Sequence, residues 1–116
     1  MFADPQSVTI NATPVSLPRV LTGNQDATYR SADETVQVRI SHQNTKSRKR
    51  RMVRLDQTVI AADPLSSENT SQKAGVYLVV DEPEFGFDDT SLGYLIDALK
   101  AFIDSSAIAK LLGGES

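Results

Sequence analysis

The sequence predicts an α+β protein in which an antiparallel meander sheet precedes two C-terminal helices. Three observations predict this class. Apolar and polar residues alternate in short runs over the first three quarters of the chain, as they do in strands that bury one face. Turn-forming residues separate these runs. From Leu92 onward the apolar residues follow the helical period instead, at Leu95, Ile96, Leu99, Phe102 and Ile103.

The N-terminal segment, residues 7–23, is expected to form a β-hairpin. The runs SVTIN at 7–11 and VSLPRVLTG at 15–23 flank the turn-prone sequence NATP. Pro18 lies inside the second run, and proline cannot donate a hydrogen bond to a neighbouring strand. The second strand is therefore expected at an edge or a bulge. A weaker strand candidate, ATYRSA, follows at 27–32.

The main sheet is expected over residues 27–81, where three runs alternate clearly: TVQVRISHQ at 35–43, RMVRLDQTVIAA at 51–62 and AGVYLVVD at 74–81. Alternation places successive side chains on opposite faces of a sheet. One face is then aliphatic, with Val36, Val38, Ile40, Val53, Leu55, Val59, Val76, Leu78 and Val80. The opposite face is polar and cationic, and carries Arg39, Ser41, Arg54, Thr58 and Tyr77.

Two connections interrupt this sheet. The loop NTKSRK is expected between the first two runs. Residues 63–73, DPLSSENTSQK, contain a single large apolar residue, Leu65, and are expected to form a long exposed loop. A loop of that length in a small domain is usually functional or mobile.

Two helices are expected over residues 89–112. The sequence DDTS at 88–91 supplies capping side chains, DSS at 104–106 separates the helices, and Gly113 with Gly114 ends the second one. We expect one domain, 1–116, in which these helices are the only cover for the aliphatic face. Because a single sheet with helices on one side is thin for a stable monomer, we expect dimerisation to complete the core.

Composition excludes several classes of function. The chain has no cysteine, which excludes a disulfide framework, a thiolate nucleophile and a thiolate metal site. Its single histidine, His42, excludes a site with two imidazoles and is expected to be a partly buried structural residue. No nucleophilic triad, paired-carboxylate motif or phosphate-binding glycine loop is present, and the acidic run at 81–89 matches no calcium loop. We therefore expect no enzyme, no cofactor and no metal site.

The sequence also gives expectations about location. No apolar run approaches the roughly 18 residues that a membrane helix needs. The start MFADPQSVTI lacks the basic and apolar regions of a signal peptide. We therefore expect no membrane partner, and a protein that is made and used in a cytoplasm.

The charge distribution is the strongest functional signal. Residues 39–54 hold 7 of the 12 lysines and arginines and no acid, in a chain with net charge -3. Such clustering indicates an anionic partner. The polar face can pair phosphates and stack an unpaired base on Tyr77, and the basic stretch adds phosphate attraction. The candidate contacts of the basic stretch are Lys46, Arg48, Lys49, Arg50 and Arg51.

Other interpretations of these residues stay open at this stage. The basic stretch could be a solvated turn that protects a sheet edge, or a nuclear-targeting run. An aromatic residue in VYLVV could belong to the core, although the aliphatic positions on either side of Tyr77 favour the polar face.

The order of elements resembles the coat proteins of the single-stranded RNA bacteriophages, the leviviruses. The resemblance covers residues 7–112. TVQVRISHQN, a short loop and RRMVRLDQTVIAAD are similar to the central hairpin of those coats, and VYLVV is similar to the strand that follows the long loop.

The resemblance implies an assembly. Two subunits join their sheets edge to edge as a homodimer, and the two C-terminal helices of each pack across the dimer partner. Dimers then form an icosahedral T=3 shell of about 180 copies. The implied location is the virion, assembled in the bacterial host cytoplasm, and the implied partner inside the shell is viral single-stranded RNA.

The resemblance also implies a site. The sheet face opposite the helices binds an RNA stem-loop, which packages the genome and represses translation of the replicase. The inward residues match Gln37, Arg39, Ser41, Arg54, Asp56 and Thr58, and Tyr77 matches a tyrosine that stacks on a base. The loop 63–73 is implied to surround the symmetry axes. Asp56 departs from the family's pattern, because it places a carboxylate on a face that meets phosphates.

Two rival functions stay open at this stage. A small dimeric RNA- or DNA-binding regulator without a shell explains the basic stretch and the helices, but gives no role to the 63–73 loop. An interaction module whose basic loop meets an acidic protein would contain no nucleic acid.

Overall fold

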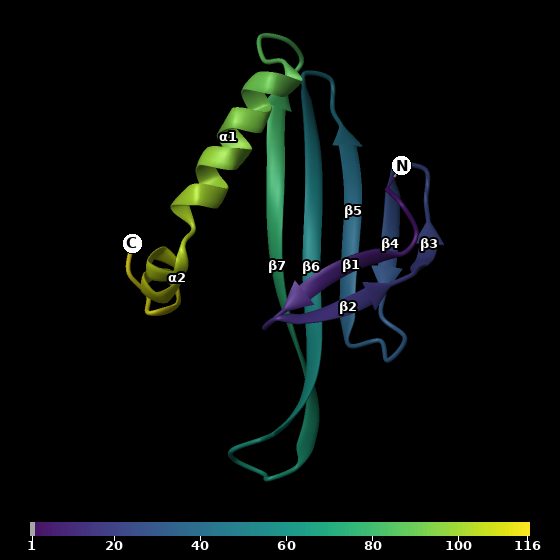
Figure 1. Ribbon diagram of the computed structural model, residues 1–116, viewed down its shortest axis with the longest axis vertical. Helices are drawn as coiled ribbons and strands as arrows, with labels where there is room; N and C mark the ends of the chain where they lie inside the picture. Colours follow the sequence, from purple (N-terminus) through teal and green to yellow (C-terminus); the bar gives the residue numbers. More distant parts are fainter. Residues whose placement is uncertain (1) are drawn as a thin grey trace. The chain divides into compact units, whose positions relative to one another are not determined.

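The computed structural model describes residues 2–116, and these form seven strands and two helices (Figure 1). The strands are β1 (Gln6–Ile10), β2 (Thr13–Leu17), β3 (Arg19–Thr22), β4 (Asp26–Arg30), β5 (Val36–Asn44), β6 (Arg48–Ala62) and β7 (Asn69–Pro83). The helices are α1 (Asp89–Phe102) and α2 (Ser105–Leu112). The chain, expected as one domain, divides into two compact units, one ending at Glu82 and one running from Pro83 to Ser116.

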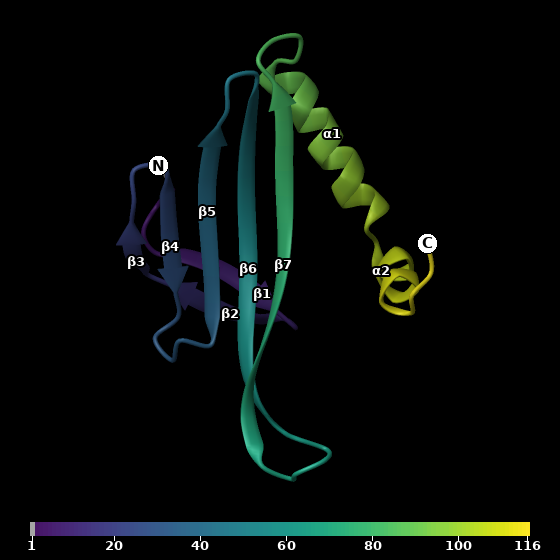
Figure 2. The same ribbon diagram turned by 180° about the vertical axis from the view of Figure 1, so that it is seen from behind.

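The sheet has the expected meander order. Five strands lie in the order β3-β4-β5-β6-β7, so consecutive strands are neighbours, and β1 and β2 form a separate two-stranded sheet (Figures 1 and 2). The register pairs Val38 of β5 with Tyr29 of β4 and Leu55 of β6. Residues paired in this way share a face, so the predicted aliphatic face is confirmed on these strands.

The expected hairpin at 7–23 is wrong in its second strand. The hairpin pairs Gln6 with Leu17 and ends there, and residues 19–22 belong to the five-stranded sheet instead. Pro18 separates the two strands because it has no N–H for a ladder, while its carbonyl accepts a hydrogen bond from Arg30 N at 3.0 Å. The expected edge position and bulge are confirmed, since β3 is an edge strand with a register shift between Arg19 and Leu21.

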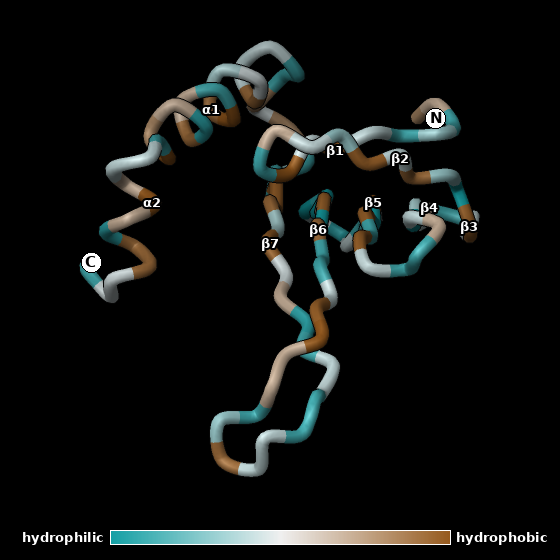
Figure 3. The backbone as a smooth tube through the Cα atoms, turned by 60° about the horizontal axis from the view of Figure 1, so that its bottom comes forward, coloured by the Kyte–Doolittle hydropathy of each residue, from teal (hydrophilic) through white to brown (hydrophobic). Residues whose placement is uncertain are grey.

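The N-terminal hairpin covers part of the aliphatic face, so the expectation that the helices are its only cover is wrong. Leu17 and Tyr29 are fully buried, and Val36, Val38 and Ile40 are nearly so. Figure 3 shows β1 and β2 lying over one side of the sheet. The partly buried residues packed against this core are Val8, Ile10, Val15, Ala27 and Leu55. Each fully buried aliphatic side chain contributes about 1.5–3 kcal/mol.

The long loop is shorter than expected. Strand β7 begins at Asn69, five residues before the predicted start at 74, so the connection is 63–68 and not 63–73. The expected exposure is confirmed, since Leu65 is 96% exposed. Strand β6 continues past Gln57, the last of its residues with a partner on β5, and the β6–β7 arm extends beyond the other strands (Figure 1).

The helices have the expected caps and no buried residue. Asp88 Oδ1 accepts a hydrogen bond from Ser91 N at 2.7 Å, and Asp104 Oδ1 accepts one from Ala107 N at 2.8 Å. Neither α1 nor α2 contains a buried residue. Their exposed apolar side chains are Tyr94, Leu95, Leu99, Phe102, Ile108, Leu111 and Leu112. Within residues 2–116, neither helix has the length and apolar character needed to cross a membrane.

Candidate nucleic-acid interface

The polar face is built by the register of three strands. Arg39 of β5 pairs with Thr28 of β4 and with Arg54 of β6, so these three side chains form a row across the sheet. A second row contains Arg30, Gln37 and Asp56, and a third contains Asp26, Ser41 and Met52. Three arginines, two hydroxyls, an amide and two carboxylates therefore lie on one surface, and Arg39, Ser41 and Arg54 lie there as alternation predicts.

Strand β7 adds an aromatic ring to this face. The guanidinium carbon of Arg54 lies 5.6 Å from the centroid of the Tyr77 ring, and Tyr77 is 60% exposed. Such a distance is that of a cation–π contact. The structure therefore brings Tyr77 to the polar face beside Arg54.

Three arginines of this face have a carboxylate partner, and none of these pairs was predicted from the sequence. Arg39 Nη2 lies 2.9 Å from Asp26 Oδ2, Arg48 Nε lies 2.9 Å from Asp81 Oδ1, and Arg54 Nε lies 2.9 Å from Asp56 Oδ1. The first two pairs are exposed, and such pairs contribute only about 0–1 kcal/mol. Their function is to order the guanidinium groups more than to stabilise the fold.

The basic stretch lies in a strand and not in the loop that was expected. Strand β6 begins at Arg48, so the turn is only 45–47 and contains Lys46. The register pairs Arg50 with Gln43, Arg51 with His42 and Lys49 with Asn44. Alternation then divides the cations: Arg48, Arg50 and Arg54 share the polar face with Thr58, while Lys49 and Arg51 share the face of Val53.

The cations on the aliphatic side have different neighbours. Arg51 Nη2 lies 2.8 Å from Oε1 of Glu82, whose side chain is 9% exposed. Lys49, Arg51 and His42 line a polar hollow of about 360 Å³, together with Asn24, Gln25 and Asn44. The expected contacts Lys49 and Arg51 are therefore not brought together with the polar-face residues.

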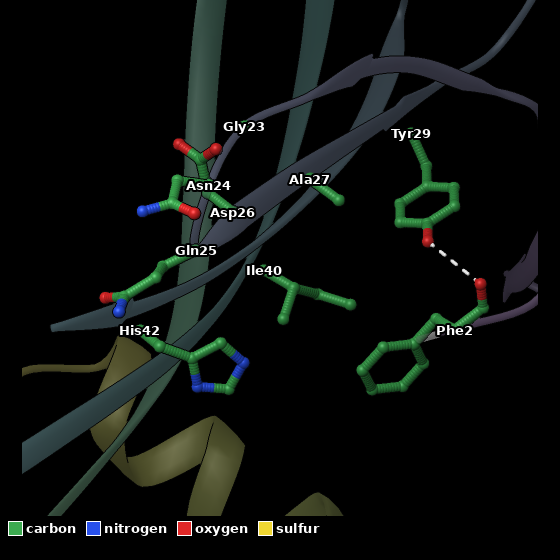
Figure 4. A pocket seen from close by; sticks show the side chains of 9 residues that line it. All are labelled: Phe2, Gly23, Asn24, Gln25, Asp26, Ala27, Tyr29, Ile40 and His42. Carbon is green, nitrogen blue, oxygen red and sulfur yellow. Dashed lines mark hydrogen bonds between the residues drawn. The ribbon is translucent and has the colours of Figure 1, made fainter.

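The histidine is exposed, so the expectation of a partly buried residue is wrong. It lines a second hollow, of about 160 Å³, with Ile40, Ala27 and Phe2 (Figure 4). Tyr29 reaches the same hollow and donates a hydrogen bond from its hydroxyl to the carbonyl of Phe2 at 3.3 Å. This hollow is mostly apolar and lies at the end of β5, apart from the arginines of the polar face.

Two carboxyl groups that do not belong to the polar face have a lowered pKa. Hydrogen bonds from the Ser31 and Thr35 side chains lower the pKa of Asp33, in the turn between β4 and β5. Hydrogen bonds from Ser91 lower the pKa of Asp88 at the start of α1. Within residues 2–116, no group of His, Asp and Glu side chains is arranged to hold a metal ion.

The sequence matches the family model described as "Phage phiCb5, coat protein" over residues 3–83. The chain belongs to this family of phage coat proteins. No curated protein sequence matches it. The predicted family is thereby confirmed: the chain is a coat protein of the single-stranded RNA phages, a structural component of the capsid and not an enzyme.

Solved structures share the coat-protein fold. The virus-like particle of bacteriophage AVE019 matches with a TM-score of 0.83 at 12% identity, over 97% of this chain and 95% of that one. The bacteriophage GA protein capsid matches with a TM-score of 0.67 at 13% identity, over 97% and 95%. An unassembled bacteriophage coat protein dimer, described as RNA-binding, matches with a TM-score of 0.57 at 18% identity, over 97% and 95%. The predicted fold class is confirmed.

Proposed function

We propose that this coat protein forms homodimers that assemble into an icosahedral shell of about 180 copies and bind genomic RNA on the polar face of the sheet. The bound RNA includes a stem-loop, and binding to it represses translation of the replicase. Assembly takes place in the cytoplasm of the bacterial host. The observation that carries the RNA function is the row of Arg39 and Arg54 beside the exposed ring of Tyr77.

The free edge of β7 supports dimerisation. The sheet ends at β7, which is 15 residues long, whereas the opposite edge, β3, has four residues and a bulge. A long edge strand presents unpaired N–H and C=O groups, and pairing with a second copy satisfies them. A twofold axis at this edge joins two five-stranded sheets into one continuous sheet.

The helices support a dimer as well. A 14-residue helix is marginal in water by itself, so its stability comes from packing of its apolar side. Since α1 and α2 contain no buried residue within this chain, their cover comes from another copy. Among the similar structures, one is described as a virus-like particle and one as a coat protein dimer, which supports dimerisation.

The polar face supports RNA binding by chemistry that suits an unpaired nucleotide. Arginines give phosphate contacts, the hydroxyl of Ser41 gives a hydrogen-bond partner, and the exposed ring of Tyr77 gives a stacking surface for a base. The similar dimer that is described as RNA-binding agrees with this function.

The test is purification of the recombinant full chain by size exclusion, with absorbance at 260 and 280 nm and electron microscopy of the excluded peak. We expect megadalton particles with a nucleic-acid spectrum. The variant Arg39→Ser with Arg54→Ser is expected to yield RNA-poor material, and Lys100→Ser on α1 is the control for loss of a cation elsewhere. Dimers that bind RNA but never form particles would instead indicate a regulator, and particles with unchanged RNA in the double variant would contradict the assignment of the face.

A further inference from the structure

Asp56 is a buried carboxylate on the face that is proposed to meet RNA. The residue is 3% exposed, although the strands around it carry mostly exposed side chains. A buried charge persists only where other groups compensate its lost hydration. A carboxylate that merely faced the RNA would repel phosphates, so its presence and its burial both need an explanation.

The partners of Asp56 are two cations of the same face. Its Oδ1 accepts a hydrogen bond from Arg54 Nε at 2.9 Å, and its Oδ2 lies 3.9 Å from Lys73 Nζ. Each oxygen therefore faces a different cation, one on β6 and one on β7. Arg54 and Lys73 keep 42% and 55% of their side-chain surface exposed, so both can reach a ligand while Asp56 lies beneath them.

The bond to Asp56 fixes the orientation of the Arg54 guanidinium. Only Nε is used, which leaves the Nη donors of the fork for a phosphate. With Nε held, the guanidinium carbon lies 5.6 Å from the centroid of the Tyr77 ring. Without the carboxylate, the long arginine side chain would sample other rotamers, and ordering it on RNA binding would cost conformational entropy.

Gly75 makes the room that this arrangement needs. A Cβ at this position would collide with Asp56 Oδ1 and would lie 3.3 Å from both Nε and Nη2 of Arg54. Lys73, Gly75 and Tyr77 occupy alternate positions of β7, so one strand supplies a cation, a gap and a ring on a single face. The missing side chain lets the Arg54–Asp56 pair lie close to the backbone of β7.

We propose that Asp56 is a positioning residue that holds Arg54 and, through it, shapes a subsite for one unpaired nucleotide, with the phosphate on Arg54 and the base on Tyr77. This inference rests on the proposed RNA-binding function. Electrostatics alone would predict that the Asp56 carboxylate repels phosphates and weakens RNA binding. As a positioning residue, Asp56 instead strengthens RNA binding.

The test measures how Asp56→Asn changes RNA affinity. The affinity falls if Asp56 positions Arg54, and it rises if Asp56 only repels RNA. Dimers of the full chain are titrated with a fluorescent single-stranded oligoadenylate at several salt concentrations. If Asp56 positions Arg54, Asp56→Asn weakens binding about tenfold, although it removes a negative charge. The slope of log K against log salt becomes shallower by about 0.7, the value of one lost phosphate contact on a single strand. If Asp56 only repels RNA, the variant binds more tightly with a steeper slope, and the proposal is overturned.

Three further variants separate positioning from charge and from folding. Glu34→Gln makes the same charge change at an exposed turn residue and is expected to leave affinity unchanged. Gly75→Ala changes no charge but displaces the pair, and it is expected to weaken binding with a cooperative urea transition retained. In an Arg54→Ser background, Asp56→Asn is expected to have no further effect, and an additive effect would contradict action through Arg54.

Absence of binding by the wild-type dimer would overturn the RNA function itself. Binding by the wild type, together with tighter binding by the Asp56→Asn variant, would overturn only the role of Asp56.

Discussion

The two faces of the five-stranded sheet are stabilised in different ways. On the aliphatic face, the hairpin of β1 and β2 buries Leu17, Val36, Val38 and Ile40 and excludes water from them. On the polar face, three arginine–carboxylate pairs order arginine side chains that stay 42% to 52% exposed. The same strands build both faces, since the side chains alternate. The first face stabilises the chain, and the second presents chemistry to a ligand.

The aliphatic face is not fully covered within one chain. The hairpin leaves part of the aliphatic side open: Val53 of β6 is 43% exposed and Val76 of β7 is 75% exposed, although Leu55 of β6 packs against the core. The polar face needs no such cover, because its side chains are hydrated or ion-paired. The proposed dimer would therefore complete the aliphatic face and leave the polar face free.

The largest expected effect is at the covered part of the aliphatic face. Leu17→Ala removes a fully buried side chain and is expected to lower the free energy of unfolding by about 2–5 kcal/mol, measured by urea denaturation. Leu65→Ala, in the exposed 63–68 turn, is the matched control and is expected to change it by less than about 0.5 kcal/mol. Equal effects of the two substitutions would mean that the hairpin does not form the core.

A smaller effect is expected at the open part of this face. Val76→Ser is expected to destabilise the proposed dimer by about 1.5–3 kcal/mol and to reduce particle yield, because in that dimer another chain covers this side of β7. Val79→Ser, on the polar side of the same strand, is expected to have little effect. Val79 is the less exposed of the two within one chain, so the opposite order of effects would show that no partner covers Val76.

A third effect concerns RNA and not stability. Lys49→Ser and Arg50→Ser each remove one exposed cation from neighbouring positions of β6, and neither residue forms an ion pair within residues 2–116. Arg50→Ser is expected to reduce the salt slope of RNA binding by about 0.7, whereas Lys49→Ser is expected to leave it unchanged. Identical slopes in the two variants would show that the basic stretch acts through its total charge.

The smallest effect is expected in the turn that joins β4 to β5 and so helps to set the register of both faces. The pKa of Asp33 is lowered by hydrogen bonds from Ser31 and Thr35, so its carboxylate stabilises the fold at neutral pH. This contribution is present above the ordinary pKa of 3.8 and is lost as pH falls through the lower folded value. The urea midpoints of wild type and Asp33→Asn are expected to differ at neutral pH and to converge in acid. A difference that persists in acid would assign the effect to another group.

Local patterns in the sequence predicted the elements and the faces well. The alternation at Val36, Val38 and Ile40 fixed which side chains of β5 point to the core, and Asp88 and Asp104 marked both helix starts correctly. The start of β7 was missed because NTSQK is polar and shows no alternation. The hairpin's position over the sheet was missed because no short-range pattern encodes which element covers which face.

The candidate site was predicted only in part, because short-range patterns show the face of a residue but not its partners on other strands. Alternation correctly placed Arg39, Arg54 and Tyr77 on one face, which is a property of each strand alone. The carboxylate partners Asp26 and Asp81 depend on how neighbouring strands align, and the gap at Gly75 depends on a close approach of two strands. Register across strands is a tertiary property, so these contacts emerge only from the folded chain.

The division of the cations along β6 has a consequence for how such coat proteins diverge. Insertion or deletion of one residue within the basic stretch would exchange the positions of Lys49 and Arg50 relative to the two sides of the strand. Overall composition and isoelectric point would hardly change, so an alignment scored on residue similarity would register almost nothing. If the polar face binds RNA as proposed, such a shift would replace the arginine of that face by a lysine and change RNA binding, although the composition of the chain is the same.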